Sequence, residues 1–338
     1  MDAHHVYSMS TRLIYSLQQR LWEYGGALEM ASLVGDPRYS FLVLLPLSFL
    51  FSLGTGLRVL WAAAMADWLN LMLKWILKDH RPYWWVPEMG PVELPRLEQF
   101  PQTCETGPGS PSGHLMVTAA TGYIVVDILC ARLRLPRMSG SVFYIKLQKM
   151  VWLSFGILLL AVGLSRVYIA THFPHQCFLG LIAGLLVGKV VNSVHMVGWR
   201  SYIYLLGSGL ILLASFSIFM LQADPLWSEA LAIKWCSQRA WVHLDTTPLY
   251  TVMRDAGTLA GAGFGINTRA SFWGHLATAV FGIITGSLLN QTIAIIPSAN
   301  KIVFYAVGFV LNALYVYGLV KFWPGLGGML IGGKKKAR

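Results

Sequence analysis

Charged residues are scarce in this chain. Only 12% of its 338 residues are Asp, Glu, Lys or Arg, whereas 55% are hydrophobic and the mean hydropathy is +0.56. Soluble domains usually carry about twice that charged fraction. The deficit excludes an ordinary soluble domain and indicates an all-α, polytopic membrane protein. Because short loops separate the apolar segments, we expect residues 1–338 to form a single helical bundle, although length alone would favour two domains.

Cysteines and acidic residues are few as well. The four cysteines have no metal-ligand spacing, and the Asp and Glu residues form no cluster with such spacing. The net charge of +11 comes largely from Lys and Arg in short loops between apolar runs, a pattern typical of membrane topology signals. We therefore expect no nucleic-acid partner. The first residues contain no uninterrupted apolar core of a signal peptide, so we expect the first membrane helix to direct insertion.

About nine apolar segments have the composition of membrane-spanning helices. We expect these spans at residues 28–53, 57–78, 115–133, 150–165, 175–195, 202–222, 256–268, 275–290 and 302–323. Residues 7–24 place apolar side chains near helical spacing, which predicts a helix lying on the membrane surface or a short helix packed on the bundle. We accordingly interpret residues 1–26 as an interfacial N-terminal segment.

The distribution of Lys and Arg predicts the orientation in the membrane. The basic loop at 132–149 and the tail at 324–338 are assigned to the cytosol by the positive-inside rule. The N-terminus and the long polar loops 79–113 and 223–253 then lie on the opposite, lumenal side. Nearly all acidic residues fall on that side, which agrees with the assignment.

Three short features bear on the same orientation. Lys335 and Lys336 resemble a dilysine signal, which is read in the cytosol and returns proteins to the endoplasmic reticulum; an ordinary basic flank is an equally good explanation. The glycosylation sequon at Asn290 begins a lumenal loop. Cys104 and Cys236 both lie in lumenal loops, where oxidation is permitted, so we predict a disulfide between them.

The stretch around which the chain is organised is FPQTCETGPGSPSGHLM, residues 100–116. Glycine and proline at this density predict a tight loop, and the apolar run after His114 predicts a helix. Ser112, Gly113 and His114 therefore lie at a helix start, where unpaired backbone N–H groups and the helix dipole favour a phosphate. From this stretch alone, a turn that carries a histidine by chance is an equal alternative.

Two further motifs accompany this stretch. Lys74 is followed after six residues by Arg81, and Arg166 is followed after five residues by His172. With PSGH between them, these motifs resemble the signature of the type 2 phosphatidic acid phosphatase superfamily, which also contains bacterial acid phosphatases and vanadium haloperoxidases. The longer stretches KWILKDHRPYWWV, QFPQTCETGPGSPSGH, SRVYIATHFPHQ and WVHLDTTP look like the glucose-6-phosphatase catalytic subunit family.

The predicted topology places all these motif residues at one lumenal face. There, Lys74, Arg81 and Arg166 would neutralise a phosphate monoester, the two arginines as bidentate forks. Ser112 and Gly113 would add donors from the helix start. Because no acidic metal cluster accompanies them, we expect these side chains to act without a metal ion or another cofactor.

The remaining chemistry needs two histidines. A neutral imidazole can attack phosphorus and form a phosphohistidine, while a second one protonates the leaving sugar oxygen and then takes a proton from water. Residue chemistry alone leaves the order open. The family resemblance implies that His172 is the nucleophile and His114 the general acid/base.

One position departs from the superfamily pattern. Four residues after the nucleophile the superfamily usually has Asp, which orients the imidazole; here Gln176 stands, as in the glucose-6-phosphatase family. Asp36, near the lumenal end of the first span, is our candidate for the orienting carboxylate, and a simple pair with Arg38 is at least as good an explanation. We interpret the other histidines as loop, interface or packing residues, with His175 as a secondary candidate: His4, His5, His175, His195, His243 and His275.

The resemblance implies hydrolysis of glucose 6-phosphate to glucose and phosphate in the lumen of the endoplasmic reticulum. Its implied partners are membrane lipid and a glucose-6-phosphate translocase. A lipid phosphate phosphatase on the same scaffold is the nearest alternative. The two long polar loops favour the sugar phosphatase, because they could cover a hydrated sugar pocket instead of leaving a lateral opening for lipid. A transporter or a non-catalytic binding protein fits less well, since the Lys, Arg and His set is intact and no internal repeat is found.

Overall fold

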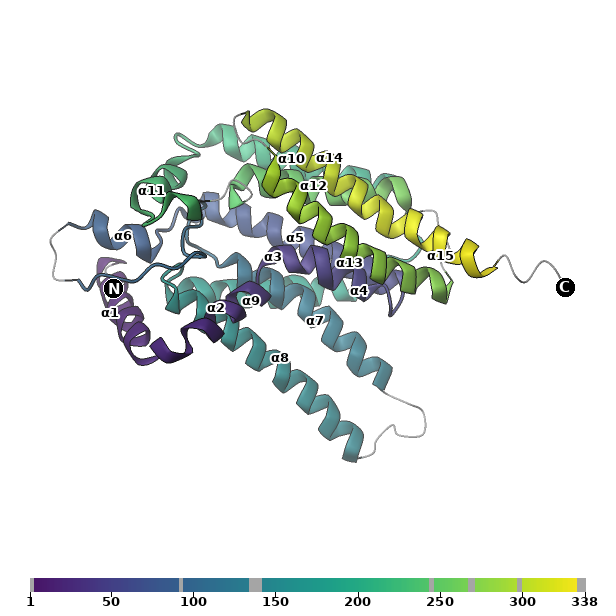
Figure 1. Cartoon of the computed structure of the whole chain (residues 1–338), viewed down its shortest axis with the longest axis horizontal. Helices are drawn as coiled ribbons and strands as arrows, with labels where there is room; N and C mark the ends of the chain where they lie inside the picture. Colours follow the sequence, from purple (N-terminus) through teal and green to yellow (C-terminus); the bar gives the residue numbers. More distant parts are fainter. Residues whose placement is uncertain are drawn as a thin grey trace.

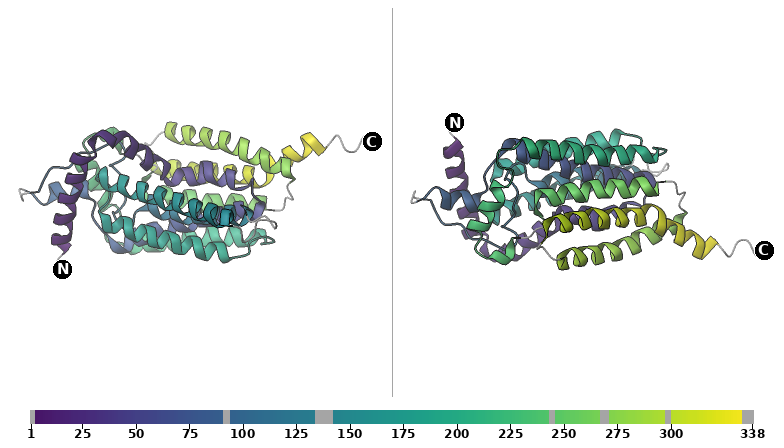
Figure 2. Two further views of the ribbon diagram at one scale, coloured as in Figure 1. Left: turned by 90° about the horizontal axis from the view of Figure 1, so that it is seen from below. Right: turned by 90° about the horizontal axis from the view of Figure 1, so that it is seen from above.

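The computed structural model describes residues 3–90, 94–133, 142–242, 246–266, 271–296 and 300–332. Within these ranges all regular structure is helical and no strand occurs, which confirms the predicted all-α class. The long helices lie side by side along the longest axis of the molecule (Figure 1). Helix α1, Ala3–Arg20, runs across one end of this bundle, transverse to the long helices (Figure 2).

The long helices of the bundle alternate in direction, and shorter helices precede, follow or connect them (Figure 1). The helices after α1 are α2 (Gly25–Val34), α3 (Pro37–Tyr39), α4 (Leu45–Ser48), α5 (Leu53–Leu77), α6 (Pro82–Glu88), α7 (Gly113–Leu133), α8 (Val142–Tyr168), α9 (Pro174–Ser193), α10 (Ser201–Leu221), α11 (Trp227–Trp235), α12 (Pro248–Gly265), α13 (Phe272–Ile295), α14 (Lys301–Tyr317) and α15 (Trp323–Gly332). In the described part of the chain, six segments are long and apolar enough to cross a membrane, namely α7, α8, α9, α10, α13 and the continuous segment Lys301–Met329. The chain is therefore a multi-pass membrane protein, and the predicted count of nine spans is not confirmed.

The first predicted span, residues 28–53, is not one helix. Helix α2 ends before Asp36, whose carboxylate caps α3 by accepting from the Arg38 amide at 2.8 Å, and Pro37 begins α3. A π-helical turn, Ser40–Leu44, then leads into α4. Because proline cannot donate the amide that a continuous helix needs, the segment is built from short helical pieces. This break places a carboxylate and a guanidinium beside the site described below.

Glycines set the closest helix contacts. A Cβ atom at Gly184 of α9 would lie 2.2 Å from the Met116 carbonyl oxygen of α7, and one at Gly261 of α12 would lie 2.1 Å from the Ala313 carbonyl oxygen of α14. Small residues let helices approach closely in lipid, where no hydrophobic force drives them together. The α7–α9 contact in particular fixes the two helices whose starts border the site.

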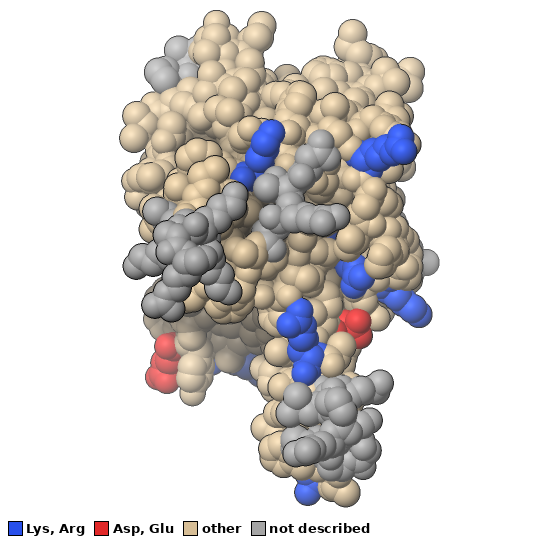
Figure 3. Space-filling model, turned by 90° about the vertical axis from the view of Figure 1, so that its right-hand side faces the viewer, with Lys and Arg blue, Asp and Glu red and all other residues tan. Residues whose placement is uncertain are grey.

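The two ends of the bundle differ in charge. Figure 3 views the end opposite α1, and Lys and Arg outnumber Asp and Glu on that face. The described cations on the helix segments that begin or end there, or directly beside them, include Arg58, Arg132, Lys146, Lys149, Lys189, Arg200 and Lys321. Such an excess of cations is typical of a cytosolic face.

At the α1 end, a disulfide joins Cys104 to Cys236, with the Cα atoms 5.8 Å apart, and confirms the predicted pairing. It ties the loop after α6 to the end of α11, so the two long polar loops are covalently linked. The sequon at Asn290 lies within α13 and not at the start of a loop. His243, Lys335 and Lys336 lie outside the described residues.

Candidate active site

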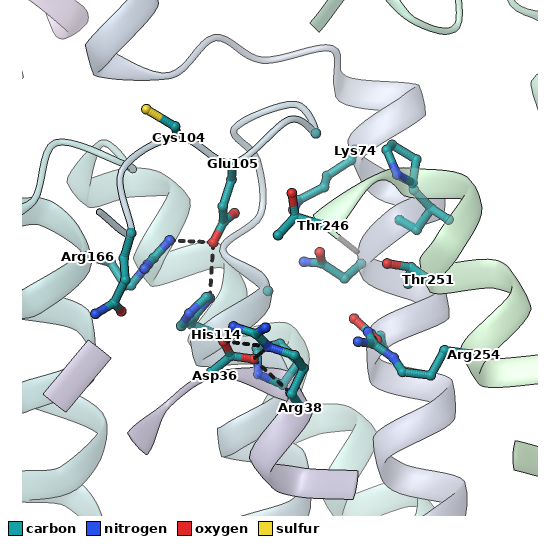
Figure 4. A pocket seen from close by; sticks show the side chains of 18 of the residues that line it. Asp36, Arg38, Lys74, Cys104, Glu105, His114, Arg166, Thr246, Thr251 and Arg254 are labelled. Carbon is teal, nitrogen blue, oxygen red and sulfur yellow. Dashed lines mark hydrogen bonds and ion pairs between the residues drawn. The ribbon is translucent and has the colours of Figure 1, made fainter. Parts of the chain in front are cut away.

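The predicted cations and histidines converge at the α1 end of the bundle. Lys74 lies in the last turn of α5 and Arg166 in the last turn of α8. Arg81 directly precedes α6, His114 is the second residue of α7, and His172 lies in the turn between α8 and α9. Figure 4 shows Lys74, His114 and Arg166 around one cavity. The structure therefore brings together the residues that motif spacing predicted.

A carboxylate that the sequence analysis did not single out lies among them. Oε2 of Glu105 is 2.9 Å from Nη2 of Arg81, and its Oε1 contacts Nη2 of Arg166. The same Oε1 lies 3.4 Å from Nδ1 of His114. Burial opposes ionisation of this carboxyl, but the guanidinium groups of Arg166 and Arg81 hold the pKa of Glu105 well below its usual value of 4.5. Glu105 is thus an anion bound by both arginines.

Arg81 is held mainly by backbone groups. Its Nε donates to the Gly107 carbonyl at 2.6 Å, its Nη2 to the Pro108 carbonyl at 3.0 Å and its Nη1 to the Thr171 carbonyl at 3.3 Å. The side chain is 0% exposed. Because three carbonyl groups fix the guanidinium, it is already oriented before any ligand binds.

The two ring nitrogens of His172 have different partners. Nδ1 lies 2.8 Å from the Gly109 carbonyl oxygen and 3.2 Å from Oε1 of Gln176, both acceptors, so Nδ1 carries the ring proton. Nε2 then carries no proton, and its lone pair accepts from Nη1 of Arg81 at 3.3 Å. Burial, and then the charge of Arg81, lower the pKa of His172 well below its usual 6.5, which keeps the imidazole neutral. The ring is thereby prepared to act as a nucleophile through Nε2.

Gln176 connects His172 to a second unanticipated carboxylate. Nε2 of Gln176 donates to Oδ2 of Asp79 at 3.0 Å. Asp79 also binds Nε2 of His175 at 3.1 Å and accepts from the hydroxyl of Tyr7. The carboxylate thus acts on the ring through an amide instead of touching it.

Asp36, our candidate for orienting His172, does not reach it. Its Oδ2 lies 2.6 Å from Nη2 of Arg38, and its carboxylate caps α3. Both Asp36 and Arg38 line the cavity near His114 (Figure 4). The geometry corrects the expectation, because the local cap and ion pair occupy this carboxylate while Gly109 and Gln176 hold the ring of His172.

Ser112 and Gly113 were both expected to donate to a phosphate, but only one of them lines the cavity. The N–H of Ser112 donates to the Gln176 carbonyl at 3.0 Å, and its buried side chain is not part of the cavity wall. Gly113 does line the cavity, and a Cβ atom there would lie 3.1 Å from Oδ1 of Asn70. Of the two residues, Gly113 alone keeps the expected position.

The cavity beside Glu105 has a volume of about 310 Å³. His114 and Arg166 line one side of it, and Lys74 of α5 lies across the space from them (Figure 4). Further polar side chains line the cavity, Asp67 and Asn70 from α5, Thr251 and Arg254 from α12, and Thr246 from the segment before α12. Arg254 also contacts Asp67 as an ion pair. A pocket of this size and polarity fits a small molecule with several hydroxyl groups.

Sequence reasoning missed Glu105 and Asp79 for the same reason. Both lie inside the motif stretches, QFPQTCETGPGSPSGH and KWILKDHRPYWWV, and the available signal was a single acidic residue within each stretch. Their partners depend on the path of irregular loops, which helical periodicity does not report. Among the described residues, no group of three or more His, Cys, Asp or Glu is arranged to hold a metal ion.

Comparison with known proteins places this geometry in a family. Residues 55–200, which include Lys74, Arg81, His114, Arg166 and His172, match the model of the PAP2 superfamily. Glucose-6-phosphatase 2 of Homo sapiens is 37% identical, with 92% of this chain and 93% of the relative covered. Glucose-6-phosphatase catalytic subunit 1 of Haplochromis nubilus is 39% identical, with 78% and 77% covered. No solved structure matches the chain.

Proposed function

The chain belongs to the glucose-6-phosphatase family within the PAP2 superfamily, and from this premise we propose that it is a phosphoric monoester hydrolase that converts glucose 6-phosphate and water into glucose and inorganic phosphate. The observation that carries the proposal is that two arginines and two histidines surround one bound anion, the carboxylate of Glu105. Guanidinium forks of this kind match the oxygens of a phosphate group.

In the first step, Nε2 of His172 attacks phosphorus on the side opposite the sugar oxygen. The N–P bond forms as the P–O bond to the sugar breaks, and His114 gives its proton to the departing oxygen. Arg81 and Arg166 stabilise the charge on the non-bridging oxygens, and Lys74 adds a third cation. The products of this step are glucose and a phosphohistidine.

In the second step, water replaces the histidine. His114, now unprotonated, takes a proton from the attacking water, the new O–P bond forms and the N–P bond breaks. His172 returns to the neutral imidazole, with Nδ1 still bound to the Gly109 carbonyl. Asp79, acting through Gln176, lowers the energy of the positively charged phosphohistidine ring.

The polar walls of the cavity support a sugar phosphate over a lipid phosphate. Asp67, Thr251 and Arg254 line it across from His114 and Arg166, and the linked loops after α6 and around α11 lie over this end (Figure 4). A purely binding or transport role would not require a neutral nucleophile facing two arginines.

We further propose that the chain forms one phosphatase domain in the membrane of the endoplasmic reticulum. The α1 end, including residues 79–113 and 223–253, then faces the lumen, and the Lys- and Arg-rich end faces the cytosol, in keeping with the positive-inside rule (Figure 3). A disulfide at the α1 end agrees with an oxidising lumen. Substrate made in the cytosol would then need a glucose-6-phosphate translocase as functional partner.

The decisive experiment is a phosphate-release assay of the detergent-purified protein with glucose 6-phosphate, mannose 6-phosphate and phosphatidic acid. We expect the highest kcat/KM with glucose 6-phosphate, and competitive inhibition by vanadate, whose adduct resembles the transition state. Preference for phosphatidic acid would favour the lipid phosphatase. Activity that EDTA abolishes and Mg²⁺ or Zn²⁺ restores would contradict a mechanism based on side-chain cations.

A further inference from the structure

Glu105 stands between the cavity and the buried nucleophile. The side chains of Arg81 and His172 are both 0% exposed and do not line the cavity, whereas that of Glu105 does. Oε2 of Glu105 lies 3.9 Å from Nε2 of His172, the atom that would attack phosphorus. A phosphate in position for this attack would lie where the carboxylate lies, and like charges in contact repel strongly in a poorly solvated site.

The donors around Glu105 exceed what a carboxylate can use. Nη1 of Arg166 binds the Ser32 hydroxyl at 2.7 Å and Nη2 binds Glu105, but the buried Nε has no hydrogen-bond partner. A carboxylate offers two oxygens in one plane. A phosphoryl group offers three non-bridging oxygens around a tetrahedral centre, so it can reach a donor that Glu105 leaves unused.

We propose that Glu105 is an internal substitute for the substrate's phosphate. In the resting site its carboxylate binds both arginines and closes His172 off from the cavity, and the phosphate of a bound substrate displaces it. This inference rests on the proposed phosphatase function, because it needs an anionic substrate at the same cations. Without the Glu105 carboxylate, the two buried guanidinium groups would have no counter-charge in the resting protein, which would be strongly destabilising.

The backbone around Glu105 shows how the displacement occurs. The neighbouring Cys104 is tied by its disulfide, the Glu105 carbonyl accepts from the Tyr83 hydroxyl at 2.8 Å, and the Thr106 hydroxyl donates to a backbone carbonyl at 3.1 Å. The main chain is therefore anchored on both sides of the residue. The carboxylate leaves by rotation of its side chain into the cavity, where Lys74 offers another cation.

The test compares Glu105→Gln with wild-type protein, using inorganic phosphate as the probe. Glutamine has nearly the same shape but no charge to compete, so we expect the inhibition constant of phosphate and the KM of glucose 6-phosphate to fall by about tenfold, the scale of one charge-assisted hydrogen bond. Without phosphate the variant should melt at a lower temperature than wild type. Saturating phosphate should then raise its melting temperature more than that of wild type.

The matched control is Glu98→Gln, which removes the same charge from an exposed position of the same loop and should leave the inhibition constant unchanged. If Glu105→Gln does not fold, Glu105→Asp keeps the charge on a shorter side chain and should lower the inhibition constant by a smaller factor. An unchanged or higher constant in the folded variant would overturn the inference. If wild type hydrolyses glucose 6-phosphate in that case, the proposed function stands; a wild type that binds no phosphate would overturn both.

Discussion

The two sides of Glu105 are built differently. Behind it, on what we call the buried side, Arg81, His172 and Gln176 are 0% exposed and are held by carbonyl groups of neighbouring loops. In front of it, on the cavity side, side chains from α3, α5, α7 and α12 line an open space. In the proposed mechanism the buried side holds the nucleophile, while the cavity side holds His114 and Arg166 together with the side chains that surround the sugar. Substitutions behind Glu105 should therefore lower kcat, and substitutions of the cavity residues other than His114 and Arg166 should raise KM.

The largest effect is expected from His172→Ala on the buried side. Removal of the nucleophile should abolish both hydrolysis and the acid-labile phosphoenzyme. Trapping with phosphate-labelled substrate measures both. The control is His195→Ala, which changes an exposed histidine between α9 and α10 and should leave activity intact. A full yield of phosphoenzyme from the His172 variant would assign the nucleophile elsewhere.

A smaller effect should follow from Asp79→Asn, which leaves the hydrogen bond from Gln176 in place but removes the charge behind the ring. We expect kcat to fall about 10- to 100-fold, the scale of one hydrogen bond to a charged group, with KM nearly unchanged. Asp127→Asn at the opposite end, where Asn192 donates to the carboxylate at 2.8 Å, is the matched control. A rise in KM with normal kcat would instead indicate that Asp79 contributes to substrate binding.

The pKa of Asp79 determines how the difference in kcat between wild type and Asp79→Asn depends on pH. Burial favours the neutral acid, but hydrogen bonds from His175, Tyr7 and Gln176 outweigh it and lower the pKa of Asp79 below its usual 3.8. In the folded protein Asp79 therefore stays ionised at neutral pH, and its interaction with the ring is lost only as the pH falls through this lowered pKa. The ratio of wild-type to variant kcat should therefore stay constant between about pH 5 and pH 8.

On the cavity side, Thr251→Val should raise KM. The Thr251 hydroxyl points into the cavity from α12 (Figure 4). Loss of one neutral hydrogen bond to a sugar hydroxyl should raise the KM of glucose 6-phosphate about 3- to 10-fold while kcat changes little. p-Nitrophenyl phosphate, which has no sugar, should be unaffected, and Thr285→Val on α13 should change neither substrate. Equal losses with both substrates would argue for a distorted helix.

The smallest effect is expected from Asp36→Asn. Asparagine still caps a helix, and an ion pair with the partly exposed Arg38 contributes no more than about 1 kcal/mol. The specific activity per folded molecule, judged by size-exclusion profile, should thus stay within about twofold of wild type. A 100-fold loss of kcat would indicate that Asp36 assists proton transfer at His114. It would also contradict the expectation that Asp36, on the cavity side, has little effect on kcat.

The sequence predicted the class and the placement of the principal groups correctly because both depend on local regularities. A low charged fraction and long apolar runs imply membrane helices, and Lys74, Arg81, His114, Arg166 and His172 all flank helix ends. Their meeting at one end follows from the alternation of helix direction. The prediction of one continuous first span was wrong for an equally local reason, since Asp36-Pro37 starts a new helix inside an apolar run.

The roles of Glu105 and Asp79 were decided only by the tertiary structure. Glu105 binds guanidinium groups from two positions far along the chain, and Asp79 reaches His172 through the amide of Gln176. Such contacts depend on where the ends of long side chains lie, and a shift of an ångström or two makes or breaks a hydrogen bond. The loops rich in glycine and proline that set these positions follow no repeating pattern, so helical periodicity in the sequence could not predict which carboxylate would hold the two arginines.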